Sequence, residues 1–316
     1  MQIIRNLSEI IGQEPATKLL KASLHSRRLA HSYLFSGPPG VGKKTTARAL
    51  LYHLFCHISS DNPCGGCLAC KKIERDIHPD IKFLHPEKKD IRIDSIREVE
   101  RFLRFRPTEG NYRVVIISQA ERLNPEAGNA LLKSLEEPPL YSLFVLITEK
   151  TYQMLPTILS RCQIVRFNPI PTDLIKEHLK RRLLCEESVA DSVAEISSGS
   201  LGWALEILNS GILEELNSFV KVGHSGSEDG KFRRLEKISK QDRNYLELLL
   251  YVLVIWIWRS YLNAKGVFNY PNSFPEEKFT GDPFIAIQEL DRAKRAIENF
   301  INTELILYTL MKKLFK

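Results

Sequence analysis

The feature that most constrains the fold is a glycine-rich loop between an apolar run and a helical pattern. The run SYLF at 32–35 is followed by SGPPGVGKKT at 36–45 and then by TARALLYHLF. Glycines let such a loop turn its backbone N–H groups toward a phosphate, the helix N-terminus adds positive potential, and the lysine reaches the outer phosphates. This order predicts a P-loop in an α/β domain, whose nucleotide-contacting residues would be Gly37, Gly40, Gly42, Lys43, Lys44 and Thr45.

The rest of the first half continues the α/β pattern. Apolar runs at 32–35, 113–117, 143–147 and 163–167 alternate with amphipathic stretches, as parallel strands do with crossover helices. We therefore expect one doubly wound domain over residues 1–170. Helical patterns at 173–184, 187–197 and 201–209 then predict a small helical domain over 171–221. The polar stretch at 222–231 predicts a linker or long loop, and 232–316 predicts a third, helical domain.

Composition and charge exclude several classes of protein. With 43% hydrophobic and 26% charged residues among 316, the chain is not collagen-like, low-complexity or disordered. The first residues carry no basic stretch followed by an apolar core, so we expect no secretory signal and a cytoplasmic protein. The apolar stretch at 248–258 is about half as long as a membrane span, which favours a buried helix and no membrane partner. Residues 1–170 hold 25 Lys and Arg against 17 Asp and Glu, a basic field suited to nucleic acid, nucleotide or acidic partners.

Three positions depart from the pattern of an ATP-hydrolysing P-loop. Lys44 stands where a Ser or Thr hydroxyl would hold Mg²⁺, and Thr45, turned by about 100° on the helix, is not an obvious substitute. The second apolar run ends in Ser118 and Gln119, where acids would hold the metal and orient the attacking water. Glu121 follows, and a solvated loop or helix-start carboxylate is a simpler interpretation of it than a displaced catalytic acid. We therefore expect no Mg²⁺-assisted hydrolysis and leave binding of ATP or ADP without hydrolysis open.

Four of the six cysteines are clustered, at Cys56, Cys64, Cys67 and Cys70, with Pro63, Gly65 and Gly66 supplying tight turns between them. Four thiolates complete a tetrahedral zinc shell and leave no position for a reactive water, so the spacing predicts a structural Zn²⁺ site near 56–70. Reduced free cysteines are the alternative. His57 and His78 could replace a thiolate, but each is more simply a surface histidine. Cys162 and Cys185 are interpreted as isolated small hydrophobes.

Taken together, these motifs resemble those of bacterial clamp-loader subunits of the AAA+ superfamily. The resemblance rests on the four cysteines and on the runs IIGQEPATKLL, HSYLFSGPPGVGK, IREVERFLRFRPTEGNYRVVII, NALLKSLEEPP and LPTILSRC. They extend over about residues 9–168 in the family's order, whereas the C-terminal half matches only in its helical character and in Gly199-Ser200-Leu201. The resemblance implies an AAA+ P-loop NTPase-type sheet domain with an inserted zinc element. A small helical lid domain and an all-α collar domain, which joins subunits into a ring, would follow it.

Within that family, the departures described above resemble the delta-prime branch, whose members do not hydrolyse ATP. Active gamma or tau subunits keep the hydroxyl, the acidic pair and an Arg in the second domain, where this chain has Lys44, Ser118 with Gln119, and Gly202. The resemblance implies a DNA polymerase III clamp-loader subunit that assembles with gamma/tau and delta to place the sliding clamp on primed DNA. The holoenzyme as a whole is a DNA-directed DNA polymerase, a nucleotidyltransferase, but nothing in this sequence suggests a polymerase active site.

The same resemblance gives Arg161, in LPTILSRC, a role in trans. In the family's SRC motif the Arg is presented to the ATP of the neighbouring subunit, where a guanidinium stabilises phosphoryl charge as an arginine finger. A surface or salt-bridged arginine is the alternative. Thr148 stands at the family's first sensor position. Lys133 is a candidate for an interface or DNA contact, and Asn129 and Glu136 are candidates for caps or salt-bridge partners; the sequence does not decide among these roles.

Arg97, Arg101 and Arg104 lie at i, i+4 and i+7, on one face of an expected helix. Phosphate contacts with DNA are one interpretation, and a solvated charged helix, with Glu98 and Glu100 on neighbouring faces, is the other. Two further functions stay open as well. An active gamma/tau-type clamp-loader ATPase predicts Mg²⁺-dependent turnover by the isolated chain. A zinc-containing nucleic-acid-binding protein predicts tight, salt-dependent DNA binding.

Overall fold

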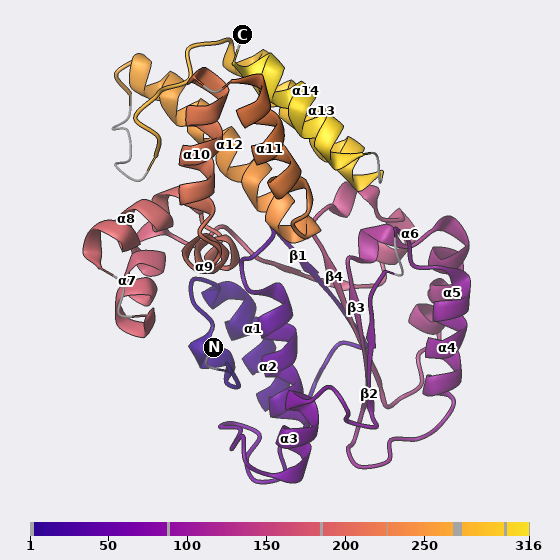
Figure 1. Cartoon of the computed structure of the whole chain (residues 1–316). Coiled ribbons are helices and arrows are strands. Elements are labelled where there is room, and N and C mark those ends of the chain that lie inside the picture. Colours follow the sequence, from indigo (N-terminus) through magenta and orange to yellow (C-terminus); the bar gives the residue numbers. More distant parts are fainter. Residues whose placement is uncertain are drawn as a thin grey trace. The chain divides into compact units, whose positions relative to one another are not determined.

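The computed structural model describes residues 3–86, 89–183, 186–225, 227–267, 274–299 and 302–315 (Figure 1). Cys185, expected to be an isolated small hydrophobe, lies outside the described residues. The chain divides into two compact units, Met1–Leu174 and Ile175–Lys316. The first unit contains the sheet and every candidate site residue, and the described part of the second is helical.

The first unit is built on a parallel sheet whose strand order, in the described residues, is β2-β3-β4-β1-β5. Tyr33 lies opposite Val145 in one parallel pair, and Ile81 opposite Val114 in another. The strands are β1 (Ser32–Ser36), β2 (Ile81–Leu84), β3 (Arg113–Ser118), β4 (Ser142–Thr148) and β5 (Gln163–Arg166). Four of these strands confirm the predicted α/β pattern, and β2 was not predicted.

Helices cover both faces of the sheet (Figure 1). They are α1 (Glu14–His25), α2 (Lys43–Phe55), α3 (Leu68–Glu74), α4 (Ile93–Leu103), α5 (Pro125–Glu136) and the short α6 (Pro156–Leu159). Side chains alternate along β1: Tyr33 and Phe35 join the apolar cluster of α1, α2 and α3, whereas Leu34 joins that of α4 and α5. Because both faces of β1, β3 and β4 are buried, these strands are continuous apolar runs in the sequence, which is why they could be predicted. The fourth predicted strand, β5, lies at an edge and buries only Val165.

The unpredicted strand β2 is short and lies at an edge of the sheet. It pairs with β3 along one side, and three of its four residues are only half-buried. Pro79 and Pro86 stand on either side of it, as turn residues do beside a loop. An edge strand needs no continuous apolar run, so hydrophobic periodicity carried little information at this position.

The described part of the second unit consists of helices. They are α7 (Thr172–Leu183), α8 (Glu187–Ile196), α9 (Leu201–Ser210), α10 (Ile212–Ser225), α11 (Glu228–Ser239), α12 (Arg243–Ala264), α13 (Pro283–Glu298) and α14 (Thr303–Leu314). Among the described residues, α12 alone is long and apolar enough to cross a membrane, but half of its most apolar stretch is buried inside the protein. Leu249, Leu253 and Trp256 are fully buried, so α12 packs as the buried helix predicted for 248–258.

The predicted linker at 222–231 is wrong, because α10 and α11 together occupy most of it. Ser227 caps α11 by accepting the N–H of Gly230 at 3.2 Å. Glu228 and Asp229 lie in the first turn, where negative charge is favourable at the positive end of the helix dipole. Polar and small residues that usually mark a loop are therefore the start of a helix here.

The glycine inside α10 makes room for an aromatic ring. A Cβ built on Gly223 would lie 2.4 Å from Cδ2 of Phe315. The ring of Phe315 also lies 4.8 Å from that of His224 and 6.0 Å from that of Phe219, measured between centroids. Gly223 therefore reflects close packing within the second unit and not a flexible connection.

Candidate functional site

The P-loop and the carboxyl-terminal ends of two neighbouring strands meet at one end of the sheet. β1 ends at Ser36 and leads into the loop, while β3 ends at Ser118 and β4 at Thr148. These strands are adjacent and parallel, with Ser36 opposite Thr148 and Ser118 opposite Ile147. The structure thus brings the predicted nucleotide-contacting loop and the predicted strand-end positions together, beside the N-terminus of α2.

Lys43 folds back onto its own loop. It is the first residue of α2, only 5% exposed, and its Nζ donates to the carbonyl oxygens of Gly37 and Pro38 at 2.6 and 2.5 Å. Burial lowers the pKa of Lys43, and the carboxylates of Glu149 and Glu121 oppose that effect. The ammonium group therefore stabilises the loop from inside, although in the P-loop pattern it would reach the outer phosphates.

The start of the P-loop has no room for a side chain. A Cβ built on Gly37 would lie 2.2 Å from the carbonyl oxygen of Phe167, a backbone atom that cannot move aside alone. The N–H of Phe167 in turn donates to the Ser36 carbonyl at 2.7 Å, which holds the loop against the end of β5. Further along the loop, Gly40 and Gly42 have φ angles of 70° and 101°, the left-handed region that the tight turn requires.

Gln13 supports the same loop, and the sequence interpretation passed over it. Its side chain is 1% exposed and donates from Nε2 to the carbonyls of Val41, at 3.3 Å, and Asn168, at 2.7 Å. Its Oε1 accepts the Asn168 N–H at 3.1 Å. The sequence signal that could have found it is its place directly before a helix with Pro15 in the first turn.

The departures from the hydrolytic pattern put a lysine, a serine and a glutamine at the positions expected to hold the metal and the attacking water. Lys44 is exposed in the first turn of α2, Ser118 is buried, and Gln119 has a left-handed backbone with φ 52°. Glu121 lies in the first turn of the 3-10 helix Ala120–Arg122, which confirms the helix-start form of the carboxylate expected there. It is half-buried, its Oε2 has no hydrogen-bond partner in the described residues, and its charge raises the pKa of Lys43.

Two threonines near the site serve the backbone. Thr148, at the predicted sensor position, is fully buried, and its hydroxyl accepts the N–H of Lys150 at 3.1 Å. Thr46 donates its hydroxyl to the Gly42 carbonyl at 2.9 Å. Thr45, one place after Lys44, is half-buried, and no hydroxyl group takes the place that Lys44 occupies.

Arg161 lies between α6 and β5, at the end of the sheet where the strands begin, opposite the end that carries the P-loop. Its carbonyl oxygen accepts the hydroxyl of Ser32, at the start of β1, at 2.6 Å. Its guanidinium lies 2.5 Å from Oε1 of Glu136 and donates to the Thr157 carbonyl at 3.0 Å. Glu136, undecided from the sequence, is thus an ion-pair partner of Arg161, whose side chain stays 34% exposed and reachable from solvent. Lys133 and Asn129 are exposed on α5.

The four cysteines converge between α2 and α3. Cys56 follows the end of α2, Cys64 and Cys67 lie in the next turns, and Cys70 is buried in α3. Their Sγ atoms all lie within 4.8 Å of one another. The N–H of Cys64 points to the Cys56 sulfur at 3.3 Å, and the N–H of Cys67 to the Cys64 sulfur at 3.3 Å. Four convergent sulfurs with backbone donors fit a tetrahedral zinc ion.

The environments of these thiols favour thiolate unequally. Burial alone raises the pKa of Cys56, but backbone N–H donors led by that of Cys64 outweigh it and lower the pKa to about 6. The pKa of Cys67 is lowered in the same way, against its burial, by the backbone of Cys70 and His57. Burial raises the pKa of Cys70. A cation among the sulfurs would offset that burial and stabilise the fourth thiolate.

The two histidines considered as metal ligands are not among the four convergent ligand groups. His57 is exposed, as expected, but the expectation that His78 is a surface residue is wrong. His78 is 3% exposed, its ring packs 4.4 Å from that of Phe55, and its Nδ1 accepts the N–H of Asp80 at 3.2 Å. Burial lowers the pKa of His78, so the neutral ring is favoured. Cys162 is partly buried against the α4 and α5 cluster, as a small hydrophobe would be.

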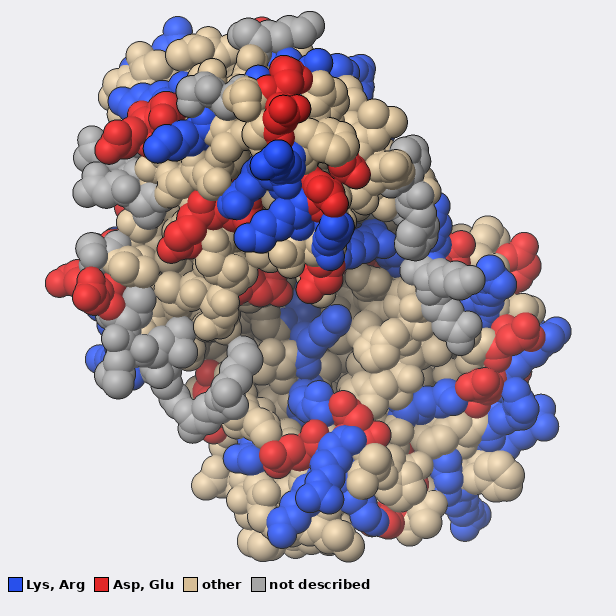
Figure 2. Space-filling view, viewed as in Figure 1, with Lys and Arg blue, Asp and Glu red and all other residues tan. Residues whose placement is uncertain are grey.

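The three arginines of α4 lie on its exposed face. Arg97, Arg101 and Arg104 are exposed, opposite a buried face formed by Ile96, Val99 and Leu103. Arg97 pairs with Asp94 at 3.0 Å. Figure 2 shows acidic and basic side chains interspersed on the side of the first unit where α4 lies, at the right of the view. Mixed charge of this kind favours a solvated helix over a stripe that binds phosphates.

Comparison with known proteins places these features in a family. The model of the family described as DNA polymerase III, delta subunit, matches residues 12–171, which include the P-loop, the cysteines and Arg161. The delta′ subunit of Bacillus subtilis DNA polymerase III is 37% identical over 167 residues, which cover 53% of this chain and 51% of that protein. The tau subunit of the same organism is 33% identical over 214 residues, covering 66% of this chain and 38% of that protein.

These curated relatives are matched over only about a third to a half of their own length. A crystal structure of a DNA polymerase III gamma subunit-related protein from Thermotoga maritima has the same fold. It superimposes with a TM-score of 0.51 and 20% identity, covering 94% of this chain and 99% of that one.

Proposed function

This chain belongs to the family described as DNA polymerase III, delta subunit, and we propose that it acts as a delta-prime-like, non-hydrolysing subunit of a bacterial clamp loader. The match over residues 12–171 confirms the family expected from the sequence motifs. In the proposed role the chain assembles in the cytoplasm with gamma/tau and delta subunits. Together they place the sliding clamp on primed DNA.

One observation carries the proposal. The positions that would hold Mg²⁺ and orient the attacking water carry Lys44, Ser118 and Gln119. Lys44 adds an exposed ammonium beside the loop, where a divalent cation would have to sit. Lys43 is bonded to the carbonyls of Gly37 and Pro38, and ATP or ADP would have to displace those bonds. Nucleotide binding without hydrolysis is the most that this loop supports.

Arg161 is the residue proposed to act on a neighbouring ATP. It lies at the end of the sheet opposite its own P-loop, so it can face another subunit while its own loop faces elsewhere. The Glu136 carboxylate and the Thr157 carbonyl hold the guanidinium, and a third of the side chain remains exposed. A planar, oriented guanidinium suits the stabilisation of charge on a transferring phosphoryl group.

The four cysteines are proposed to hold one structural Zn²⁺. Bound by four thiolates, the ion has a filled tetrahedral shell and therefore serves to fix the fold. Through the shared ion, Cys56 at the end of α2 would be joined to Cys67 and Cys70 at the start of α3.

The helices of the second unit are proposed to form a lid domain, residues 171–221, and a collar domain, residues 232–316. An aromatic cluster on α12 and α13 supports a role of the collar in assembly. Its ring centroids lie 5.6 Å apart for Trp258 and Tyr261 and 6.2 Å apart for Trp258 and Phe284. Trp258 and Phe284 are both exposed, and exposed aromatic groups are enriched at the centres of protein interfaces.

An active gamma/tau-type ATPase is the second candidate, because the chain also matches the tau subunit of Bacillus subtilis over 214 residues. It would require Thr45 and Glu121 to replace the missing hydroxyl and acids. Glu121 is close enough to raise the pKa of Lys43, which is the specific observation in its favour.

Reconstitution separates the two candidates. The purified chain is mixed with the gamma/tau and delta subunits of its organism, and DNA-stimulated ATPase is measured. A large loss from Arg161→Ala with little loss from Lys43→Ala supports a passive site and a finger acting in trans. A large loss from Lys43→Ala, with turnover by the isolated chain, would instead establish an active ATPase.

A further inference from the structure

The N-terminal residues 3–10, here called the strap, contact residues 57–66, here called the metal loop, which lie between Cys56 and Cys67 and carry Cys64. We propose that metal bound by the four cysteines fixes the strap, so that loss of the metal releases residues 3–10 while the sheet keeps its structure. The inference rests on the metal site proposed above and is independent of the clamp-loader role. Its evidence is a set of contacts between the strap and residues 60–65, the one with Ser60 being made through His53.

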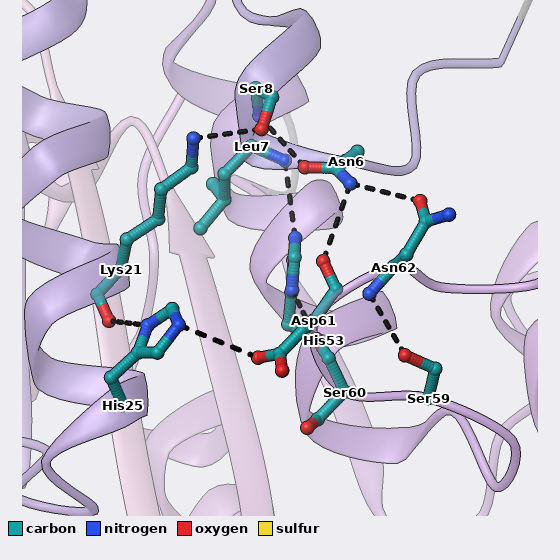
Figure 3. Close-up of polar contacts among 10 residues, drawn as sticks. All are labelled: Asn6, Leu7, Ser8, Lys21, His25, His53, Ser59, Ser60, Asp61 and Asn62. Carbon is teal, nitrogen blue, oxygen red and sulfur yellow. Dashed lines mark hydrogen bonds and ion pairs between the residues drawn. The ribbon is translucent and has the colours of Figure 1, made fainter.

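A buried imidazole connects the strap to the metal loop. His53, in the last turn of α2 and 5% exposed, accepts the backbone N–H of Leu7 on Nε2 at 3.2 Å. Its Nδ1 lies 2.5 Å from the carbonyl oxygen of Ser60 (Figure 3). A carbonyl can only accept, so Nδ1 carries the proton, Nε2 is the free acceptor, and the ring is neutral. A single side chain thus holds the strap on one side and the metal loop on the other.

Asn6 makes the second set of contacts. Its side-chain amide donates to the carbonyl of Asp61 at 3.4 Å and to Oδ1 of Asn62 at 3.1 Å (Figure 3). Its own Oδ1 accepts the N–H of Ser8 at 2.9 Å, which shapes the start of the 3-10 turn Leu7–Glu9. Asp61 and Asn62 lie between the first two metal ligands, so the acceptors of Asn6 are placed by the loop itself.

Arg5 makes the third contact, across the tight turn between Cys64 and Cys67. Gly65 has φ +69°, and a Cβ built on it would lie 2.8 Å from Nε and 2.9 Å from Cδ of Arg5. The Arg5 side chain therefore lies directly on the Gly65 backbone. Its NH2 group continues to Oε2 of Glu74, at the end of α3, at 3.3 Å. The strap thus contacts the metal loop directly at Asp61, Asn62 and Gly65.

The loop has little besides the metal to order it. Residues 57–66 contain no helix or strand, and Ile58 is exposed. The Asn62 N–H to Ser59 Oγ bond, at 3.0 Å, and the N–H to sulfur contacts are its internal hydrogen bonds among those described. A loop that buries so little apolar surface does not offset its ordering entropy, so metal ligation has to supply the order. The buried side chain of Leu7 belongs to the large apolar cluster that holds Cys70 and Ile73 of α3 together with residues of α1, α2 and the sheet.

The release should stop before α1. Gln13, directly before that helix, is fixed by hydrogen bonds to Val41 and Asn168, neither of which belongs to the metal loop. The expected boundary between released and retained structure therefore lies between residues 10 and 13.

Hydrogen exchange of the full chain, with zinc bound and after its removal by a chelator, tests the proposal. Zinc content is measured in the same samples. We expect one zinc per chain, and roughly tenfold or faster exchange at residues 5–8 after removal, with β1, β3 and β4 unchanged. If zinc is bound and can be removed, but the strap exchanges equally slowly in both states, the inference is overturned while the metal site stands. A chain that binds no zinc yet protects the strap shows that both ideas are wrong.

Variants with metal bound test the contacts themselves. His53→Gln should raise strap exchange by a similar factor while one zinc per chain is retained. His25→Gln is the matched control, because the His25 ring is largely exposed and meets the loop only at 3.7 Å from Asp61. Asn6→Ala repeats the test without altering the buried ring, in case His53→Gln does not fold. Unchanged protection in both His53→Gln and Asn6→Ala would contradict the proposal.

Discussion

The carboxylate of Glu136 holds the guanidinium of Arg161, with Oε1 of one 2.5 Å from NH2 of the other. The two side chains are 48% and 34% exposed, so the pair contributes little to stability, about 0–1 kcal/mol. Its effect is on orientation. Together with the Thr157 carbonyl, it fixes the direction in which the remaining N–H donors of Arg161 point.

Substituting Arg161 should therefore reduce the ATPase rate of the assembled complex much more than substituting Glu136. Arg161→Ala should lower turnover at the neighbouring site by more than about tenfold, since an arginine finger typically contributes 10³-fold or more. Glu136→Gln should lower kcat about two- to fivefold with little change in KM, since orientation is lost but the cation remains. Steady-state DNA-stimulated ATPase measures both. Glu137→Gln, which alters the adjacent exposed carboxylate, is the control, and a loss as large as that of Glu136→Gln would sink the orientation argument.

Lys44→Thr should restore part of a metal site without restoring catalysis. The hydroxyl would replace an ammonium at the position that contacts Mg²⁺, so Mg²⁺ should now tighten ATP binding by about tenfold. Hydrolysis should stay absent, because Ser118 and Gln119 still supply no acid. Isothermal titration with and without Mg²⁺, followed by phosphate release, measures the two effects. Turnover by this single variant would mean that Glu121 already acts as the catalytic acid.

Cys64→Ser should abolish metal binding and destabilise the first unit, whereas Cys162→Ser should do neither. The first removes one of four convergent sulfurs, and the second removes a half-buried thiol outside the cluster. Structural zinc contributes several kcal/mol or more to folding in small domains, so a clear fall in the thermal midpoint is expected. Zinc content and thermal unfolding of the full chain decide the matter. Equal zinc in both variants would refute the four-cysteine site.

Asp80 should give the first unit a stability that depends on pH. Burial alone raises its pKa, but the carboxylate accepts the N–H groups of Thr108, Glu109 and Gly110 at 2.7, 2.7 and 3.0 Å, and the net pKa is lowered. Because the native pKa lies below the unfolded value of about 3.9, this stability is present above that pH and is lost as pH falls through the native pKa.

Asp80→Asn should therefore cost about 1–3 kcal/mol at neutral pH, since an amide cannot accept three N–H groups as a carboxylate does. The difference from the wild type should shrink below about pH 4, as the wild-type carboxyl becomes protonated. Urea titrations at pH 7 and at pH 3, followed by exchange of the β3 peptide, measure both values. A difference that stays constant over this range would exclude the ionised carboxylate as its cause.

Gly223→Ala should destabilise the second unit, although Gly→Ala inside an exposed helix usually stabilises by about 1 kcal/mol. The added methyl would lie 2.4 Å from the Phe315 ring, which would have to leave its place. Thermal unfolding measures the change. Phe315→Ala in the same background should restore the usual benefit of alanine, and a stabilising Gly223→Ala on its own would contradict the packing described here.

The sequence was most informative where chemistry is local. The P-loop, the cysteine spacing and four of the five strands each depend on residues close together in the chain, and each could be predicted. The helix start at Ser227 was missed because capping residues resemble loop residues when their partners are unknown. The contact of Glu136 with Arg161 and that of His53 with Leu7 join distant segments, and no periodicity reports them. Strand β2 was not predicted for a different reason: three of its four residues are only half-buried, and such residues need not form a continuous apolar run.

Strand β1 runs between Arg161 and the P-loop: its first residue, Ser32, bonds to the Arg161 carbonyl, and its last, Ser36, leads into the loop. The two sites are therefore one strand length apart, roughly 13 Å at 3.3 Å per residue. Under the proposed function this separation gives the subunit a direction. A donor end and an acceptor end on opposite sides of the sheet make contacts between subunits head-to-tail, and such contacts build a closed ring where the rotation between neighbours closes and an open row where it does not. A member whose acceptor end is inert can contribute an arginine but does not need one from a neighbour. Its natural place in such a row is at an end, where it terminates the series of working sites.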